Sequence, residues 1–194
     1  MTLARPREAA LHEAATRLFR ERGFHATSMQ DLAEDLGMNR GSLYHYIDAK
    51  DDLLWAIVSG AMARLETAVR PILEGTGAVP DRLGRAIEAH LGFAAEHGDE
   101  LALIQIELRA LAPERRAILI AQRDAYEGAW REVIRQGVGD GSLRPVDVPL
   151  ASIAILSVCN WFTQWFRPDG ALGVPAIGGE FADLFLDGMR APVP

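Results

Sequence analysis

Apolar residues recur at intervals of three and four along nearly the whole chain, and this period most constrains its fold. Such spacing places apolar side chains on one face of an α-helix. The sequence shows no sustained alternation of β-branched and polar residues, the pattern that predicts a half-buried strand. With 194 residues, about half of them apolar, the chain can bury a substantial core. The sequence therefore predicts an all-α protein.

Glycines, prolines and capping residues divide the helical pattern into about nine segments. The helices are expected at residues 7–22, 29–36, 40–46, 48–74, 82–97, 100–111, 114–136, 148–166 and 176–189. The first three, in residues 1–50, form one predicted domain, and residues 51–194 form a second, larger helical bundle. The long helix after Asp48 connects the two domains and is expected to couple them mechanically.

Several classes of function are disfavoured by what the sequence lacks. Cys159 is the single cysteine, which excludes an internal disulfide and a multi-thiolate metal site. No GxSxG, HExxH, glycine-rich phosphate loop or Cys/His cluster is present. We therefore expect no catalytic residues, no metal site and no cofactor.

The chain is expected to be cytoplasmic and to have no membrane partner. Its first residues, MTLARPREAA, do not form a secretory signal. The most apolar stretch, LASIAILSVCNWFTQWF, is interrupted by Asn160, Thr163 and Gln164 and is marginal for crossing a bilayer.

The net charge of −7 lies entirely in the second domain. Residues 1–50 carry seven basic and seven acidic side chains and are formally neutral. A neutral first domain permits DNA binding without arguing for it. The argument for DNA must therefore come from the motif.

The stretch LGMNRGSLYHYIDAKDDLL contains the turn GMN between two very short helices, which is typical of a helix-turn-helix. Either Thr27 with Gln30 or Ser28 with Asp31 can form the capping pair of the first short helix. Asn39 can cap the second. In that helix Leu43 and Ile47 are expected to point inward. Tyr46 is assigned to the core side, whereas Tyr44, in a different phase, is expected to point outward.

The outward side chains of the second short helix can contact a DNA groove. Arg40 can reach a phosphate or a guanine edge, and Tyr44 and His45 can contact phosphates, bases or a thymine methyl group. Gly41 and Ser42 permit close approach of the backbone. Arg5 and Arg7, near the N-terminus, are expected to be solvated, with contact to the DNA backbone as the alternative.

The motif TSMQDLAEDLGMNRGSLYHYIDAKDDLL resembles the N-terminal signature of the TetR family of bacterial transcriptional repressors, over about residues 5–54. The resemblance implies a phosphate clamp by Lys50 and the start of the following helix. Two departures are Ala49, where the family usually has Ser or Thr, and Ile47, where it usually has Phe. The predicted DNA-binding residues are Thr27, Ser28, Asn39, Arg40, Gly41, Ser42, Tyr44, His45 and Lys50.

For the second domain, the resemblance implies a helical ligand-binding bundle whose last two helices pair with those of a second subunit. The expected helix at 148–166 is apolar nearly all round, and FADLFLDGM adds a second apolar stripe. A homodimer would bury both surfaces.

Candidate ligand-binding residues are polar or aromatic side chains on apolar helix faces, which need polar partners when buried. They are Gln105, Glu107, Tyr126, Trp130, Asn160, Trp161, Gln164, Trp165 and Arg167. Core or dimer packing is the alternative interpretation of each.

NWFTQWFRPDG followed by an F-A-D-L-F-L-x-G helix resembles the TetR regulators of fatty-acid or sterol breakdown, whose effectors are acyl-coenzyme A thioesters. This implies an acyl group near Trp161 or Trp165 and its charged end near Arg167. The predicted function is a dimeric repressor, released from a palindromic double-stranded operator by an apolar or acyl-CoA-type ligand. The alternatives are an effector-free DNA-binding regulator and a helical lipid carrier or enzyme.

Overall fold

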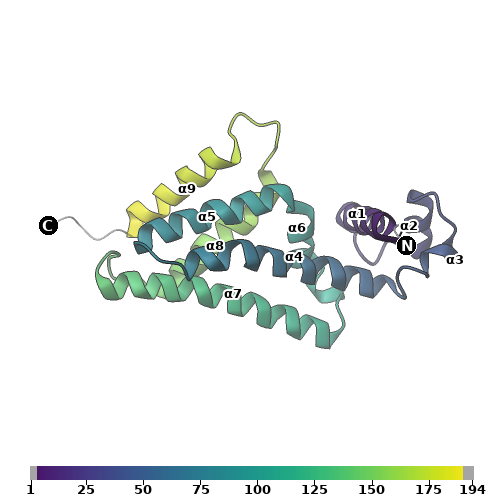
Figure 1. Ribbon diagram of the computed structural model, residues 1–194, viewed down its shortest axis with the longest axis horizontal. Coiled ribbons are helices and arrows are strands. Elements are labelled where there is room, and N and C mark those ends of the chain that lie inside the picture. The colour runs from purple at the N-terminus through teal and green to yellow at the C-terminus, as the bar shows by residue number, and fades with distance from the viewer. Residues whose placement is uncertain (1–3, 190–194) are drawn as a thin grey trace. The chain divides into compact units, whose positions relative to one another are not determined.

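The protein is described here by a computed structural model covering residues 4–189, with side chains from residue 7 onward. These residues form nine α-helices, one short 3-10 helix and no β-strand (Figure 1). The helices are α1 (Ala4–Arg22), α2 (Met29–Asp35), α3 (Arg40–Leu43), α4 (Lys50–Leu73), α5 (Val79–Glu96), α6 (Gly98–Ile106), α7 (Pro113–Asp140), α8 (Val148–Trp165) and α9 (Val174–Met189). The all-α prediction is confirmed. No helix in the described range is long and apolar enough to cross a membrane.

The chain divides into two compact units. The first unit contains the residues up to Met62 together with Asp99–Leu119, and the second contains Ala63–Gly98 and the residues from Ile120 onward. Helices α4 and α7 each begin in the first unit and continue into the second. The division at residue 50 remains a prediction, and residues 99–119 join the first unit although they are distant in sequence.

The core of the first unit is built from apolar residues of its short helices. Leu18 and Phe19 of α1, Leu32 of α2 and Leu43 of α3 are all fully buried. Gly23 ends α1 with φ +86°, a backbone conformation that only glycine adopts readily. The chain can therefore turn at once from α1 toward α2.

Helix α2 begins with a capping box between Ser28 and Asp31. The Ser28 hydroxyl accepts a hydrogen bond from the Asp31 backbone N–H at 3.1 Å, and the Asp31 carboxylate accepts one from the Ser28 N–H at 2.7 Å. Of the two capping pairs that the sequence allowed, the structure uses this one.

Helix α3 is a single turn and is shorter than the predicted helix at 40–46. After Leu43 the backbone hydrogen bonds span three residues, as in a 3-10 helix. The His45 N–H donates to the Ser42 carbonyl at 3.3 Å, and the Tyr46 N–H donates to the Leu43 carbonyl at 2.9 Å. These shorter bonds tighten the chain, and one bond of the α-helical type remains, from the Ile47 N–H to the Leu43 carbonyl at 3.3 Å.

In the second unit, α5 packs against both α8 and α9 (Figure 1). Two glycines permit the close approach of α5 and α9. A methyl group on Gly84 would lie 3.6 Å from Leu186, and one on Gly178 would lie 3.1 Å from Glu88. Trp130 and Phe162 are fully buried in this unit.

The C-terminal end of α4 is closed by a buried arginine. Arg82 of α5 donates hydrogen bonds to the carbonyls of Leu73 at 3.1 Å and Gly75 at 2.9 Å, and to the Gln136 side chain at 2.6 Å. Carbonyls at the end of a helix lack partners within the helix, so this guanidinium satisfies them.

Candidate nucleic-acid interface and buried polar cluster

The exposed face of α3 carries an arginine and an aromatic ring that contact each other. Leu43 is fully buried, whereas Tyr44 keeps 41% of its surface exposed. The Arg40 guanidinium donates to the Tyr44 hydroxyl at 3.2 Å and lies 5.8 Å from the centre of its ring. His45 is also exposed. The helix thus presents cationic, hydroxyl and imidazole groups to the outside.

Asn39 holds the start of α3. Its side-chain oxygen accepts hydrogen bonds from the backbone N–H of Ser42 at 2.8 Å and from the Ser42 hydroxyl at 3.0 Å. Asn39, Gly41 and Ser28 are exposed, and Ser42 is partly exposed. Seven of the nine predicted DNA-binding residues therefore lie at least partly exposed on the α2–α3 segment.

Thr27 is different because it is buried. Its hydroxyl donates to the carbonyl of Gly23 at 2.9 Å and lies 3.3 Å from that of Leu18. These bonds fix the connection between α1 and α2. In this conformation the hydroxyl stabilises the turn.

Lys50, at the start of α4, is half-buried and supports the same connection. Its ammonium donates to the carbonyls of Phe24 at 2.7 Å and Thr27 at 2.6 Å, and lies 4.2 Å from the centre of the Phe24 ring. A cation over an aromatic face is a favourable contact. The ammonium is thus engaged with the protein, so a phosphate clamp would have to share it.

In the second unit, Tyr126 and Trp130 of α7 and Asn160 of α8 gather around His90 of α5. The His90 Nδ1 atom lies 3.1 Å from the Tyr126 hydroxyl, and the rings of Tyr126 and Trp130 meet edge to face at 6.3 Å. A hydrogen bond with Asn160 also acts on His90. We call these four residues the buried polar cluster.

The buried polar cluster is electrically neutral near pH 7. Burial lowers the pKa of His90 to about 4, against a smaller opposing effect of Asn160. Burial also raises the pKa of Tyr126 and brings the pKa of neighbouring Cys159 to about 12. A ligand group that binds at the buried polar cluster would have to be uncharged or bring its own counter-charge.

Two nitrogen atoms of the buried polar cluster have no hydrogen-bond partner of normal geometry within residues 4–189. They are His90 Nε2 and Trp130 Nε1. Weaker hydrogen-bonding contacts still link His90 to Asn160 and Trp130 to Tyr126, so both side chains have polar neighbours. Tyr126, Trp130 and Asn160 were predicted from the sequence as ligand candidates, whereas His90 was not. The one signal for His90 is its place on the apolar stripe of α5.

The remaining ligand candidates lie elsewhere. Trp161 is 63% exposed and Trp165 44% exposed on α8, while Gln164 and Arg167 are also exposed. Arg167 lies 3.4 Å from the Asp169 carboxylate. The structure does not bring these four residues into the buried polar cluster.

Gln105 and Glu107 belong to the first compact unit. Gln105 is exposed, and the Glu107 carboxylate accepts a hydrogen bond from the Phe24 N–H at 2.9 Å. No group of three potential metal ligands occurs among the described side chains.

Comparison with known proteins identifies both parts of the chain. A family described as "Bacterial regulatory proteins, tetR family" matches residues 11–57. A second, described as "Tetracyclin repressor-like, C-terminal domain", matches residues 76–189. The repressor KstR2 of Rhodococcus jostii is 30% identical over 189 residues, which cover 96% of this chain and 92% of the relative.

Two solved structures extend this likeness. The ketosteroid transcriptional regulator KstR2 of Mycobacterium tuberculosis superposes with a TM-score of 0.90 and 28% identity, covering 96% of each chain. AibR, solved in complex with isovaleryl coenzyme A and operator DNA, superposes with a TM-score of 0.82 and 29% identity, covering 96% of this chain and 100% of AibR. These relatives regulate transcription and are not enzymes. Residues 11–57 and 76–189 together show that the chain belongs to the TetR family of transcriptional regulators.

Proposed function

We propose that this regulator is a homodimeric repressor that binds a palindromic operator and leaves it when an acyl-coenzyme A-type ligand enters the second unit. Its place of action would be the cytoplasm, where bacterial DNA lies. The observation that carries the proposal is the outward face of α3, where Arg40 and Tyr44 are exposed while Leu43 between them is buried. Such a face is suited to a major groove.

An apolar stripe on the second unit supports the dimer. On α8 the exposed residues Leu150, Ile153, Trp161 and Trp165 follow helical spacing, and Leu184 of α9 is 71% exposed. Large contiguous apolar surfaces on a regulator are typical of subunit interfaces. Trp161 and Trp165 therefore fit a dimer interface better than a ligand site. A two-fold dimer presents two α3 helices, which favours a symmetric operator.

The buried polar cluster supports a ligand site in the second unit. It combines neutral hydrogen-bonding groups with apolar surroundings, as binding sites for apolar ligands do. The relative AibR was solved in complex with isovaleryl coenzyme A. An acyl group is uncharged, so it suits a neutral cluster, while the charged coenzyme A portion would stay outside it.

An effector-free regulator is the alternative. It would bind DNA equally well but would give no ligand to the neutral buried polar cluster around His90. Mass spectrometry of the purified protein under native conditions distinguishes the two, because an effector-free protein has no ligand to retain.

Operator binding is tested by selecting sequences from random duplexes with the full-length protein. We expect an enriched inverted repeat with half-sites about one helical turn, or a multiple of it, apart. Enrichment of a sequence without two-fold symmetry would contradict the proposed dimer mode.

Release is tested by titrating acyl-coenzyme A thioesters of different chain lengths against the operator complex. Tryptophan fluorescence reports ligand binding, and the anisotropy of labelled DNA reports release. A Trp130→Phe variant should lose most of the fluorescence change, whereas Trp55→Phe should keep it. If fluorescence responds while the DNA stays bound, the ligand is real and the release is not.

A further inference from the structure

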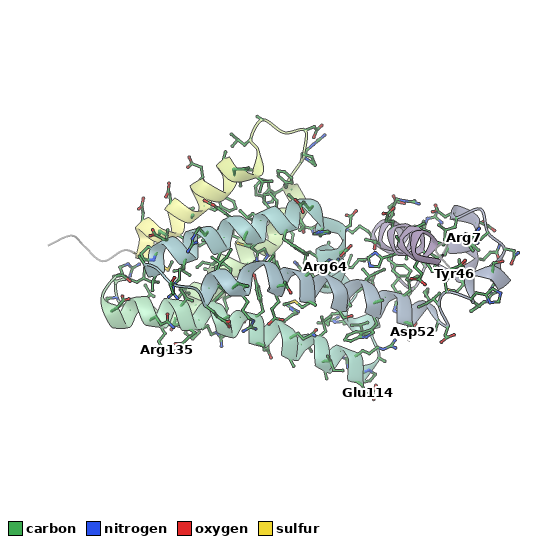
Figure 2. All side chains as sticks on the ribbon, viewed as in Figure 1. Arg7, Tyr46, Asp52, Arg64, Glu114 and Arg135 are labelled. Carbon is green, nitrogen blue, oxygen red and sulfur yellow. The ribbon has the colours of Figure 1, made fainter. Side chains whose placement is uncertain are left out.

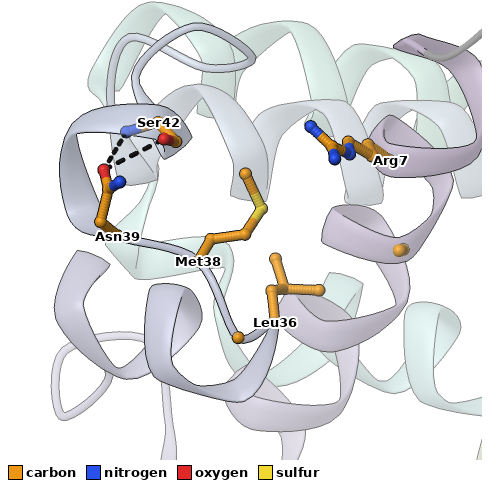
Figure 3. A pocket seen from close by; sticks show the side chains of 7 residues that line it. Arg7, Leu36, Met38, Asn39 and Ser42 are labelled. Atoms are coloured by element: carbon orange, nitrogen blue, oxygen red, sulfur yellow. Dashed lines mark hydrogen bonds between the residues drawn. The ribbon is translucent and has the colours of Figure 1, made fainter.

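A hollow of about 380 Å³ opens beside the start of α3 (Figure 3). Its wall is formed by Arg7 and Ala10 of α1, by residues 36–39 and by Ser42. Arg7 and Asn39 stand on opposite sides of it (Figure 3). Arg7 is the only charged residue of this wall.

The Arg7 guanidinium is exposed, and its Nη1 donates to the Tyr46 hydroxyl at 3.3 Å. The two labelled side chains lie close together in Figure 2. This hydrogen bond raises the pKa of Arg7, so the side chain stays charged. Among the described residues, Tyr46 is the group that acts on the charge of Arg7, and no carboxylate does so. The other guanidinium nitrogens are thus available to an external anion.

Three other arginines of α1 whose side chains the structure describes lie beside carboxylates. Arg17 pairs with Asp35 at 2.6 Å, Arg20 lies 3.6 Å from Asp99, and Arg22 lies 3.6 Å from Asp31. Arg7 differs from these three because its hydrogen-bond partner is the neutral hydroxyl of Tyr46. The formally neutral first domain therefore has a local positive charge at this hollow.

Polar groups on the opposite wall complement this charge. Asn39 uses its side-chain oxygen to bind Ser42, so its amide N–H groups remain as donors. No acidic residue lines the hollow. A side chain beside the reading helix, rather than on it, meets the sugar–phosphate backbone that borders the groove.

We propose that this hollow binds one phosphate group of the DNA backbone, with Arg7 as its cation and Asn39 as an additional donor. The proposal rests on the DNA binding proposed above and adds to the helix-turn-helix a contact from Arg7 of α1. A guanidinium can bind two phosphate oxygens at once, which would fix the register of α3 in the groove.

The test measures operator affinity as a function of salt concentration for Arg7→Ala and for Arg17→Ala. Both changes remove one positive charge from the same helix, but only Arg7 lines the hollow. We expect Arg7→Ala to reduce the slope of log affinity against log salt by about 0.9 for each protomer bound. Arg17→Ala should leave the slope unchanged. Arg7→Lys should retain it, because the charge remains.

Binding to a random duplex is measured in parallel. A backbone contact carries no sequence information, so Arg7→Ala should weaken operator and random DNA by a similar factor. The site is disproved if the salt slopes of Arg7→Ala and Arg17→Ala are equal, or if only operator binding weakens. Failure of the wild-type protein to bind any duplex would instead contradict the proposed function itself.

Discussion

The Glu107 carboxylate accepts a hydrogen bond from the backbone N–H of Phe24 at 2.9 Å, across 83 positions of sequence. The backbone carbonyl of Phe24 accepts a hydrogen bond from the Lys50 ammonium at 2.7 Å. Phe24 itself is buried and packs edge to face on Phe19. Residues from α4 and from the segment after α6 thus hold both polar groups of Phe24, just before the helix-turn-helix.

Glu107→Ala should destabilise the first unit, because the buried Phe24 N–H would lose its acceptor. The expected loss is about 1–3 kcal/mol of unfolding free energy. Hydrogen exchange of the Phe24 amide measures it directly and should become faster. Glu107→Gln keeps an acceptor oxygen and should exchange more slowly than Glu107→Ala. The exposed Glu114 serves as the control, since Glu114→Ala should not change this amide.

Lys50 can be tested chemically because it is the only lysine of the chain. Its two carbonyl bonds and its half-buried position should make reductive methylation slow in the folded protein. Peptide mapping by mass spectrometry separates its reaction from that of the N-terminal amine. Methylation of Lys50 as fast in folded as in unfolded protein would contradict the contacts described here.

Leu43→Ala and Tyr44→Ala should have opposite effects. Leu43 is fully buried, so its truncation should cost about 2–5 kcal/mol of stability. Tyr44 is exposed, so its truncation should weaken DNA binding with little change in melting temperature. Thermal denaturation and DNA anisotropy on both variants measure these effects. An early-melting Tyr44→Ala beside a stable Leu43→Ala would mean that α3 presents a different face.

Stability should fall as the pH decreases from about 6.5 toward 4 because of His90. Unfolding returns the pKa of His90 from about 4 to its ordinary value of 6.5, so protons favour the unfolded chain within that range. Above about pH 6.5 His90 is neutral in both the folded and the unfolded chain, so no stability is lost to its protonation. The full loss at low pH is about 3 kcal/mol of unfolding free energy. Denaturant unfolding across this range should show a smaller pH dependence in His90→Gln. The exposed His45 provides the comparison, because His45→Gln should keep the wild-type dependence.

Trp161→Glu and Leu184→Glu should each prevent formation of the proposed dimer and abolish binding to a two-fold operator. Both side chains are largely exposed on the apolar stripe, where a carboxylate would be buried in the dimer. Sedimentation velocity measures the oligomeric state. Ile120→Glu adds the same charge on α7, outside the stripe, and should remain dimeric. Dimers that persist in both stripe variants would exclude α8 and α9 from the interface.

The sequence by itself determined the helical class, the helix-turn-helix and the phase of α3. These features depend on the spacing of neighbouring residues. Leu43 and Tyr44 are adjacent in sequence, so one faces the core and the other faces solvent as soon as the helix forms. Asn39 caps α3 within three residues, which is also a local property. For α2 the sequence allowed two capping pairs, and the structure uses Ser28 with Asp31.

The tertiary structure alone decided which distant side chains meet. His90 and Tyr126 are 36 residues apart, and Lys50 lies 26 residues from Phe24. Periodicity placed Glu107 on an apolar helix but could not reveal that its partner would be a backbone N–H at the end of α1. Local spacing fixes which face of a helix a residue occupies. The partner of that face depends on how the helices pack, and packing arises from the burial of the whole apolar surface at once.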